Sequence, residues 1–330
     1  ECYCTGAMLL EHPNKLLVAA SSIPLFIVGG ILLIVYVGYA VQFLLPIALA
    51  HDGNAWGADS GSAAQTGAMA LMVLFHVVFA LVVVSYLRAC FSDPGRVPQW
   101  YIDDQDRRHH AVASSGRPAA ASGPPGSDDE RPADESAPLR DAEAGSDATT
   151  PLSSRFCRVC QHYKPQRAHH CSVCGRCVLR YDHHCVWVCN CVGLGTHKFF
   201  FLFVWWGFCG CLLVLSSMLP TTSSYLFKKH SDDGYRPSVL EGFALLLTFA
   251  FSISLSCFTA MHVYMLLRGL TTVEMHLSER YDFGVPINVR TVMGDNPWYW
   301  LLPTAPRGQG DGVSWPRPRV GSPRPPRESL

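Results

Sequence analysis

Residues 68–87 read AMALMVLFHVVFALVVVSYL, and this stretch decides the architecture of the chain. It contains no charged residue and a single histidine, His76. An α-helix rises about 1.5 Å per residue, so roughly 20 apolar residues cross the hydrocarbon layer of a bilayer. The stretch therefore predicts one membrane-spanning helix.

Three other stretches meet the same criterion, namely residues 16–50, 199–219 and 243–267. The second of these begins with a cluster of Phe and Trp residues, which is typical of the aromatic belt where a span enters the bilayer. One such stretch alone could be a buried core helix, but four of them in 330 residues favour a membrane protein. We therefore predict an all-α integral membrane protein with four transmembrane helices.

The overall composition agrees with this architecture. Hydrophobic residues make up 49% of the chain and charged residues 16%, whereas soluble proteins carry about 25% charged residues. The 26 Lys and Arg residues balance the 26 Asp and Glu residues, which removes any argument from bulk charge for binding nucleic acid. The expected partner is the lipid bilayer, with no nucleic acid.

The basic residues near the spans predict the orientation of the protein. Five of them fall on one side of a four-span topology, whereas the loop of residues 51–67 contains neither Lys nor Arg. The basic residues of the 220–238 loop argue weakly for the opposite orientation. We place both termini and the long loop after the second span in the cytosol. The five residues are Lys15, Arg88, Arg96, Lys198 and Arg268.

Polar segments divide the chain into units. Residues 111–154 are rich in Ala, Ser, Gly, Pro and charged residues, and residues 304–330 are rich in Pro and Arg. Both lack the apolar side chains that a folded core requires, so we predict that both are disordered. The predicted units are residues 1–110 with spans 1 and 2, the linker 111–154, a compact insert 155–198, residues 199–270 with spans 3 and 4, a C-terminal segment 271–303, and the tail 304–330.

Cysteine and histidine crowd into the compact insert. Eight of the fourteen cysteines lie between positions 157 and 191, together with two adjacent histidine pairs. A C-x2-C pair can place two thiolates on one tetrahedral zinc ion, and this spacing occurs twice near the start of the insert. The cysteine pairs are Cys157/Cys160 and Cys171/Cys174, and the histidine pairs are His169/His170 and His183/His184.

A disulfide network is the alternative reading of these cysteines. It is disfavoured because thiols remain reduced in the cytosol, where we place the insert. A segment of about 40 residues with few large apolar side chains cannot hold its shape by burial alone, and each zinc ion would contribute on the order of 10 kcal/mol of folding free energy. Two ions take eight ligands, so at least one cysteine is left over, and we expect reactivity there.

The complete pattern C-x2-C-x9-HC-x2-C-x2-C-x4-DHHC-x5-C resembles the cysteine-rich domain of the DHHC protein S-acyltransferases, or palmitoyltransferases. The resemblance continues outside the insert. Asp93-Pro94-Gly95 follows the second span and resembles the DPG motif of the family, while Thr271-Thr272-Val273-Glu274 follows the fourth span and resembles its TTxE motif. Residues 288–303 are similar to the C-terminal segment of the family.

The resemblance implies a role for each residue of the insert. The family's two structural Zn²⁺ sites are closed sets of three cysteines and one histidine, which leaves no open position for catalysis by the metal. Cys185 resembles the nucleophile, His183 the general base, and Asp182 the group that orients this base. The implied first zinc site is Cys157, Cys160, His170 and Cys177, and the second is Cys171, Cys174, His184 and Cys191.

The resemblance also implies a two-step reaction. Cys185 would attack the thioester of a long-chain acyl-CoA such as palmitoyl-CoA, and a cytosolic cysteine of a membrane-associated protein substrate would then take the acyl group. The four spans would hold the acyl tail in an apolar cavity. The implied location is a membrane of the endomembrane system (Golgi, endoplasmic reticulum or plasma membrane), with the active site facing the cytosol.

Simpler interpretations stay open for several residues. His183 could be a further ligand or supporting group, and His162 is expected at the surface. Thr271 and Glu274 have the spacing of a capping box, which competes with any contact to the active site. Val186 and Cys189 depart from the family pattern, which commonly has Pro and Asn at these positions.

Two other functions are compatible with part of the sequence. A catalytically silent zinc-binding membrane scaffold or sorting protein would need the insert but not a reactive Cys185. A metal transporter is disfavoured because the predicted spans contain His76 and His262 but no acidic ligand at mid-depth.

Overall fold

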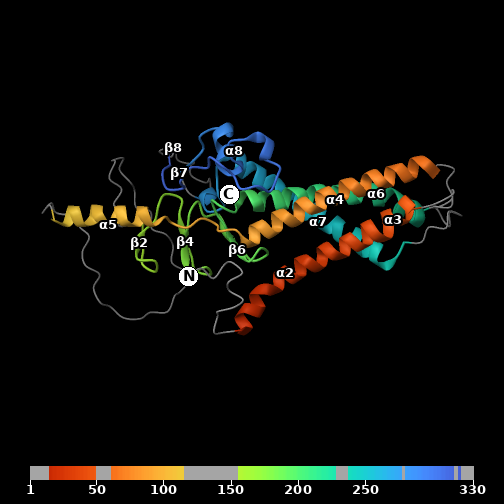
Figure 1. Ribbon diagram of the computed structural model, residues 1–330, viewed down its shortest axis with the longest axis horizontal. Helices are drawn as coiled ribbons and strands as arrows, with labels where there is room; N and C mark the ends of the chain where they lie inside the picture. Colours follow the sequence, from red (N-terminus) through yellow and green to blue (C-terminus); the bar gives the residue numbers. More distant parts are fainter. Residues whose placement is uncertain are drawn as a thin grey trace, which may run out of the picture.

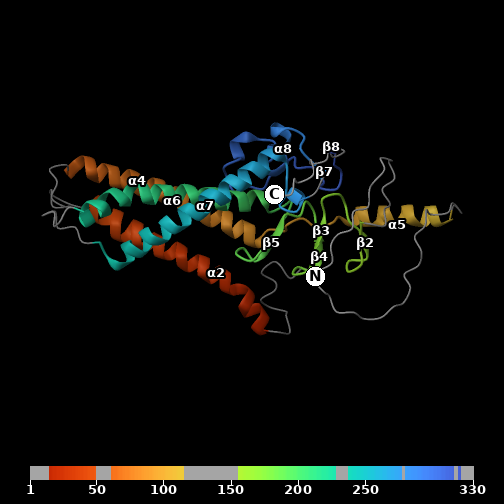
Figure 2. The same ribbon diagram turned by 180° about the vertical axis from the view of Figure 1, so that it is seen from behind.

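The computed structural model describes residues 15–49, 61–114, 155–227, 237–276, 279–315 and 319–320. The predicted linker lies outside the described residues from position 115 onward, as does most of the tail beyond residue 315. The molecule is elongated, with long helices at one end and short hairpins at the other (Figures 1 and 2).

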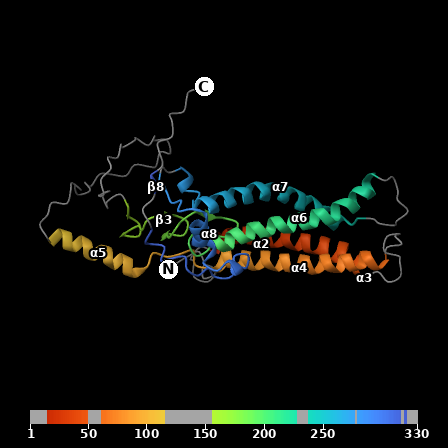
Figure 3. The same ribbon diagram turned by 90° about the horizontal axis from the view of Figure 1, so that it is seen from above.

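Four helical segments are long and apolar enough to cross a membrane, and they lie side by side along the long axis (Figures 1 and 3). Their apolar windows have mean hydropathies between 1.9 and 2.7, which confirms the four predicted spans. The spans are Ile23–Leu49, Ala63–Phe91, His197–Ser224 and Val239–Arg268. They belong to α2 (Lys15–Tyr36) with η1 (Val37–Leu44) and α3 (Leu45–Leu49), α4 (Gly61–Phe91), α6 (His197–Phe227) and α7 (Val239–Arg268).

The helices are apolar on all sides, as expected when lipid rather than water surrounds them. Side chains such as Phe26 point outward and are 78% exposed. Inside the bundle, Tyr39 and Phe75 pack edge to face with ring centroids 4.8 Å apart. The π-helix η1 contains Gly38, where a Cβ would lie 2.7 Å from the carbonyl oxygen of Leu240. A side chain at this position would therefore push the first and fourth spans apart.

The insert consists of three two-stranded antiparallel hairpins that do not join into one sheet. Hairpins of two or three residues per strand are not stable by themselves in water. The hairpins therefore need further stabilisation, and they carry the cysteine and histidine side chains that could supply it by binding metal ions. The strands are β1 (Phe156–Cys157) with β2 (His162–Tyr163), β3 (His169–Cys171) with β4 (Arg176–Val178), and β5 (His183–Cys185) with β6 (Asn190–Val192).

Backbone and side-chain contacts fix the insert to the end of α4. The amide of Asn190 on β6 donates to the carbonyls of Ala89, Cys90 and Ser92 at distances of 3.0, 3.2 and 2.9 Å. The carbonyls of Ala89 and Cys90 belong to the last turn of α4, where carbonyl groups have no partner within the helix, and Ser92 follows directly after it. The DPG motif follows directly, and the Gly95 carbonyl accepts from the Leu179 amide at 3.0 Å.

The segment after α7 turns back onto the insert. Asn288 of α8 (Val285–Met293) donates to the Leu267 carbonyl at 2.8 Å, so this helix is anchored to the end of the fourth span. The remaining elements are the 3₁₀ turns η3 (Glu274–His276) and η4 (Pro297–Tyr299), the strand pair β7 (Glu279–Arg280) and β8 (Arg319–Val320), and the helix α5 (Gln99–Ser114).

Two elements differ from the sequence-based expectation. Helix α5 was not predicted, and it extends to Ser114, four residues into the segment expected to be disordered. Residues 304–315, at the start of the expected disordered tail, follow a described path along α8 and the insert. The contacts along this path come from residues distant in sequence, which the local composition does not reveal.

Candidate active site and metal centres

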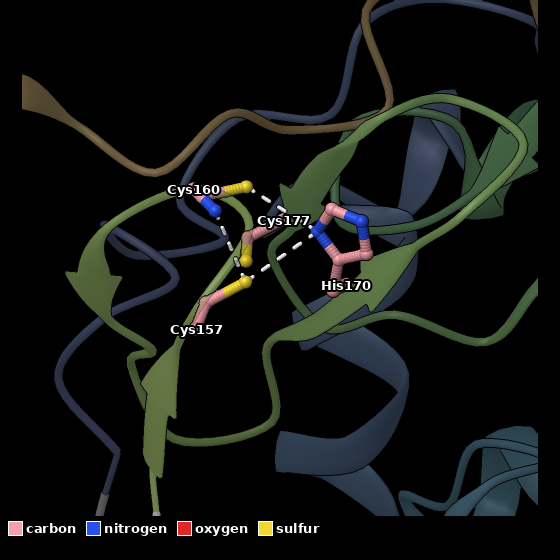
Figure 4. A group of neighbouring side chains, drawn as sticks. All are labelled: Cys157, Cys160, His170 and Cys177. Atoms are coloured by element: carbon pink, nitrogen blue, oxygen red, sulfur yellow. Dashed lines mark hydrogen bonds between the residues drawn. The ribbon is translucent and has the colours of Figure 1, made fainter. Parts of the chain in front are cut away.

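Among the described residues, two groups of side chains could each hold a metal ion, and we call them the first and second metal-binding groups. The first consists of Cys157, Cys160, His170 and Cys177, whose ligand atoms all lie within 4.8 Å of one another (Figure 4). The Sγ atoms of Cys157 and Cys160 lie 3.5 and 3.3 Å from Nδ1 of His170. A tetrahedral ion with bonds of about 2.3 Å to sulfur and 2.0 Å to nitrogen requires separations near these values. The geometry therefore fits one zinc ion.

The second group consists of Cys171, Cys174, His184 and Cys191, and it has the same form. The three Sγ atoms lie 3.7, 3.4 and 3.6 Å from Nδ1 of His184. Both groups are the sets expected from the sequence, and each offers four ligands, so a bound ion has no open position. Such an ion would hold neighbouring hairpins together.

Two of the eight cysteines of the insert, Cys185 and Cys189, remain outside both groups, and a repeat in the insert explains why Cys185 is one of them. Cys157, Cys171 and Cys185 are fourteen residues apart. The first two each begin a C-x2-C pair that is completed by a histidine and a cysteine from the next hairpin. After Cys185 the corresponding positions hold Val188 and Lys198, which cannot complete a zinc site. The fourteen-residue spacing is thus a sequence signal that Cys185 begins a third repeat without the ligands of a third metal site.

Cys185 lies at the end of β5, next to the side chains of Asp182 and His183. Nδ1 of His183 donates to Oδ1 of Asp182 at 2.8 Å, and His183 also shares a hydrogen bond with Cys185. This places the imidazole between a carboxylate and a thiol. The three residues expected to form the active site are thus in contact with one another.

The electrostatics of this group follow from those contacts. Burial by itself lowers the pKa of His183, but the hydrogen bonds with Asp182 and Cys185 raise it to about 9. Burial opposes ionisation of Asp182 as well, yet the hydrogen bond from His183 and the electrostatic interaction with His197 hold its pKa well below its usual range. The carboxylate therefore stays charged and favours an imidazolium beside the thiol.

Asp182 has a further partner that the sequence did not predict. The hydroxyl of Thr272 lies 2.8 Å from Oδ1 and 2.6 Å from the backbone carbonyl of Asp182. The predicted capping interaction is also present, because the Thr271 amide donates to Oε2 of Glu274 at 3.0 Å. Glu274 in turn pairs with the buried Arg167 at 2.6 Å. The TTxE segment therefore caps a turn and contacts the active site.

An apolar environment surrounds the thiol of Cys185. It packs in one cluster with residues from the ends of α4 and α6, including Tyr86, Cys90 and Phe200. Tyr86 and Cys90 also line a groove of about 470 Å³ between α2 and α4, which reaches along the spans to Tyr36 and Phe79. Tyr86 and Cys90 thus belong both to the cluster that contains Cys185 and to the lining of the groove.

Near His183 lies a buried cluster of Arg180, His197 and His262, which was not predicted from the sequence. Nη1 of Arg180 lies 2.6 Å from Nδ1 of His197, and both side chains are almost fully buried. The ring of Phe200 lies between His183 and His262, with centroids 5.3 Å from each. Only packing of α6 and α7 against the insert brings these residues together.

Two other histidines and one of the two departures from the motif, Cys189, have simple structural roles. His162 is buried rather than at the surface, because its Nδ1 bonds the Tyr163 carbonyl at 3.0 Å within the first hairpin. His76 bonds Tyr36 on the neighbouring span at 3.2 Å. Cys189 adopts a positive φ of 49° at the end of the β5–β6 turn, a conformation that Asn and Gly adopt more readily.

The chain is similar to known proteins over most of its length. Residues 151–279 match the family described as DHHC palmitoyltransferase. The chain is 30% identical over 319 residues to Probable protein S-acyltransferase 12 of Arabidopsis thaliana, covering 94% of this chain and 93% of that protein. It is 32% identical over 274 residues to Palmitoyltransferase ZDHHC20 of Bos taurus, covering 80% and 70% of the two chains. A third relative, Probable protein S-acyltransferase 14 of Arabidopsis thaliana, is 33% identical over 287 residues, covering 83% and 84%.

The pattern of the insert, the four spans and the motifs that follow spans 2 and 4 all lie within the region of similarity to these relatives. Because identity reaches 30% over 94% of the chain, the agreement extends well beyond the cysteine motif. The chain therefore belongs to the DHHC palmitoyltransferase family.

Proposed function

We propose that this protein is a protein S-palmitoyltransferase that transfers an acyl group in two steps through Cys185. One observation carries the proposal. Cys185 is outside both metal-binding groups, contacts the His183–Asp182 pair, and borders an apolar groove between two spans. A reactive thiol next to a space for a hydrocarbon chain suits transfer of a fatty acyl group.

In the first step, the Cys185 thiolate attacks the carbonyl carbon of the acyl-CoA thioester. A new carbon–sulfur bond forms at Cys185, the bond to the CoA sulfur breaks, and CoA leaves as a thiolate that takes a proton from the His183 imidazolium. Asp182 remains ionised throughout and holds Nδ1 of His183, so the other ring nitrogen faces the reacting sulfur.

The groove between α2 and α4 would hold the acyl chain. Its lining is almost entirely apolar, and each buried CH₂ group contributes about 0.8 kcal/mol. A palmitoyl chain would therefore bind far more tightly than a short acyl chain. Binding along the spans places the thioester at the level of the insert, where Cys185 lies.

In the second step, a cysteine of a membrane-associated protein would attack the acyl-enzyme, with His183 as the base. One thioester replaces another, so the step is nearly balanced in energy and depends on positioning. We place the insert and both termini on the cytosolic side, which makes a cytosolic cysteine the acceptor. The two groups of Cys3His ligands would each hold a structural Zn²⁺ that stiffens the hairpins carrying Cys185.

The test is metabolic labelling with a clickable palmitate analogue. The wild-type protein should carry a label that hydroxylamine removes, and Cys185→Ser should carry none. Cys257→Ser is the matched control, because this thiol is exposed on α7, and it should label normally. Label that persists at the wild-type level in Cys185→Ser would disprove the assignment of the nucleophile.

A further inference from the structure

The chain after η4 returns to the insert along a defined path. The carbonyl of Arg307 accepts from the Asp295 amide at 3.0 Å, and the side chain of Gln309 donates to the Val292 carbonyl of α8 at 2.8 Å. We call residues 307–315, with the sequence RGQGDGVSW, the C-terminal strap. It lies in the segment that the sequence assigned to a disordered tail.

Glycine allows the strap to lie directly on the insert. Gly308, Gly310 and Gly312 all have positive φ values, of 80°, 81° and 70°, which other residues rarely adopt. Gly312 is buried, and a Cβ there would clash with Leu194 and lie 3.0 Å from Cδ1 of Leu179. The strap backbone therefore rests on the two leucines that join the second and third hairpins to the DPG motif.

A tight turn at the end of the strap directs Trp315. The carboxylate of Asp311 accepts from the amides of Val313 and Ser314 at 2.9 and 2.8 Å. The indole of Trp315 donates to the Gly312 carbonyl at 3.1 Å. These bonds fix the ring against the insert.

Trp315 covers one face of a buried guanidinium. The central carbon of Arg167 lies 4.5 Å from the Trp315 ring centroid and 4.6 Å from that of Tyr281. Arg167 is 3% exposed, and the rings of Trp315 and Tyr281, whose centroids lie 6.4 Å apart, both shield its guanidinium from water. Its edge donates to Glu274 at 2.6 and 2.7 Å and to the Gly269 carbonyl at 2.7 Å.

This cluster continues to the active site. Glu274 accepts from the Thr271 amide at 3.0 Å, and the next residue, Thr272, bonds Asp182 through its hydroxyl. We infer that Trp315 is a positioning residue: by holding Arg167 it fixes the TTxE turn and, through Thr272, the orientation of Asp182. The inference rests on the proposed function, because it assigns a supporting role at the same site.

The experiment compares Trp315→Ala with Trp315→Phe in the purified, full-length, zinc-loaded protein in lipid nanodiscs. Phe keeps an aromatic face for the guanidinium, and Ala removes it. Trp100→Ala on α5 is the matched control, because it removes the same side chain from a position that is 53% exposed. Five quantities are measured: kcat and KM for palmitoyl-CoA in auto-acylation, the rate at which iodoacetamide modifies Cys185, the folded fraction, and the zinc content.

For Trp315→Ala we expect kcat per folded molecule to fall roughly threefold to tenfold, while KM changes less than about twofold because no residue of the strap lines the groove. Iodoacetamide modification should slow as well, and zinc content should stay the same. Trp315→Phe should restore both rates to within about twofold of wild type. Trp100→Ala should behave as wild type.

Three results would overturn the inference: unchanged rates in Trp315→Ala, a loss fully explained by less folded protein, or no recovery in Trp315→Phe. Failure of the proposed function has a separate signature, because the wild-type protein would then not acylate Cys185. In that case the iodoacetamide rates still decide whether the strap orients the active site.

Discussion

The contact between Thr272 and Asp182 gives the sharpest test of how the active site works. Thr272→Val removes one hydroxyl and keeps the shape of the side chain. The hydroxyl lies 2.8 Å from Oδ1 of Asp182, whose side chain is completely buried. Its loss leaves the carboxylate with His183 and the more distant Thr272 amide, at 3.4 Å, as its partners.

The size of the effect follows from the charge on Asp182. A hydrogen bond to a charged group contributes about 1.5–3 kcal/mol, and 1.36 kcal/mol corresponds to a factor of about ten in rate. One hydroxyl proton is shared between Oδ1 and the backbone carbonyl, which favours the lower end of this range. We expect single-turnover acylation of Cys185 to slow by roughly tenfold.

The assay is the rate of acyl incorporation from labelled palmitoyl-CoA at saturating concentration. Thr272→Ser keeps the hydroxyl and should retain most of the activity. Thr291→Val is the control, because among the described residues its hydroxyl bonds the Ile287 carbonyl within its own helix α8 and no part of the candidate active site. A rate within twofold of wild type for Thr272→Val, or an equal loss for Thr291→Val, would refute this account of Asp182.

Two further predictions concern the metal groups and the ionisation of His183. Cys177→Ser removes one ligand of the first group, so native mass spectrometry should find one zinc ion per chain instead of two, with lower thermal stability; two retained ions would contradict the ligand assignment. The pKa of His183 is about 9 in the folded protein and 6.5 in an unperturbed histidine. Protonation of His183 therefore stabilises the folded state fully below pH 6.5, and this contribution disappears as the pH rises through 9. Asp182→Asn removes a main cause of the shift, so alkylation of Cys185 at pH 7–8 should slow; an unchanged pH profile would show that Asp182 does not control His183.

Local patterns in the sequence were sufficient for the spans and for the two C-x2-C pairs, whereas the resemblance to the family supplied the division of the eight ligands into two groups. A helix in lipid must satisfy its own backbone hydrogen bonds, so a run of about 20 apolar residues specifies a span without help from the rest of the chain. The two cysteines of a C-x2-C pair are close enough in sequence to bind one ion, so this spacing predicts that they meet, but the histidine and the third cysteine of each group come from the next hairpin. The two groups found around His170 and His184 are those predicted.

Tertiary structure alone decided what surrounds the active site. Asp182 meets Thr272, Arg167 meets Trp315, and Asn190 meets the end of α4, in each case across about 90 residues or more. No local period or motif spacing encodes such contacts, because they arise where the ends of the spans bring distant segments to one side of the bundle. The same reason explains the C-terminal strap. Its composition suggested disorder, because composition does not show that its glycines and Trp315 pack against the insert. The chemistry proposed for Cys185 follows from neighbouring residues, whereas the support of its partner Asp182 depends on contacts between distant segments of the described chain.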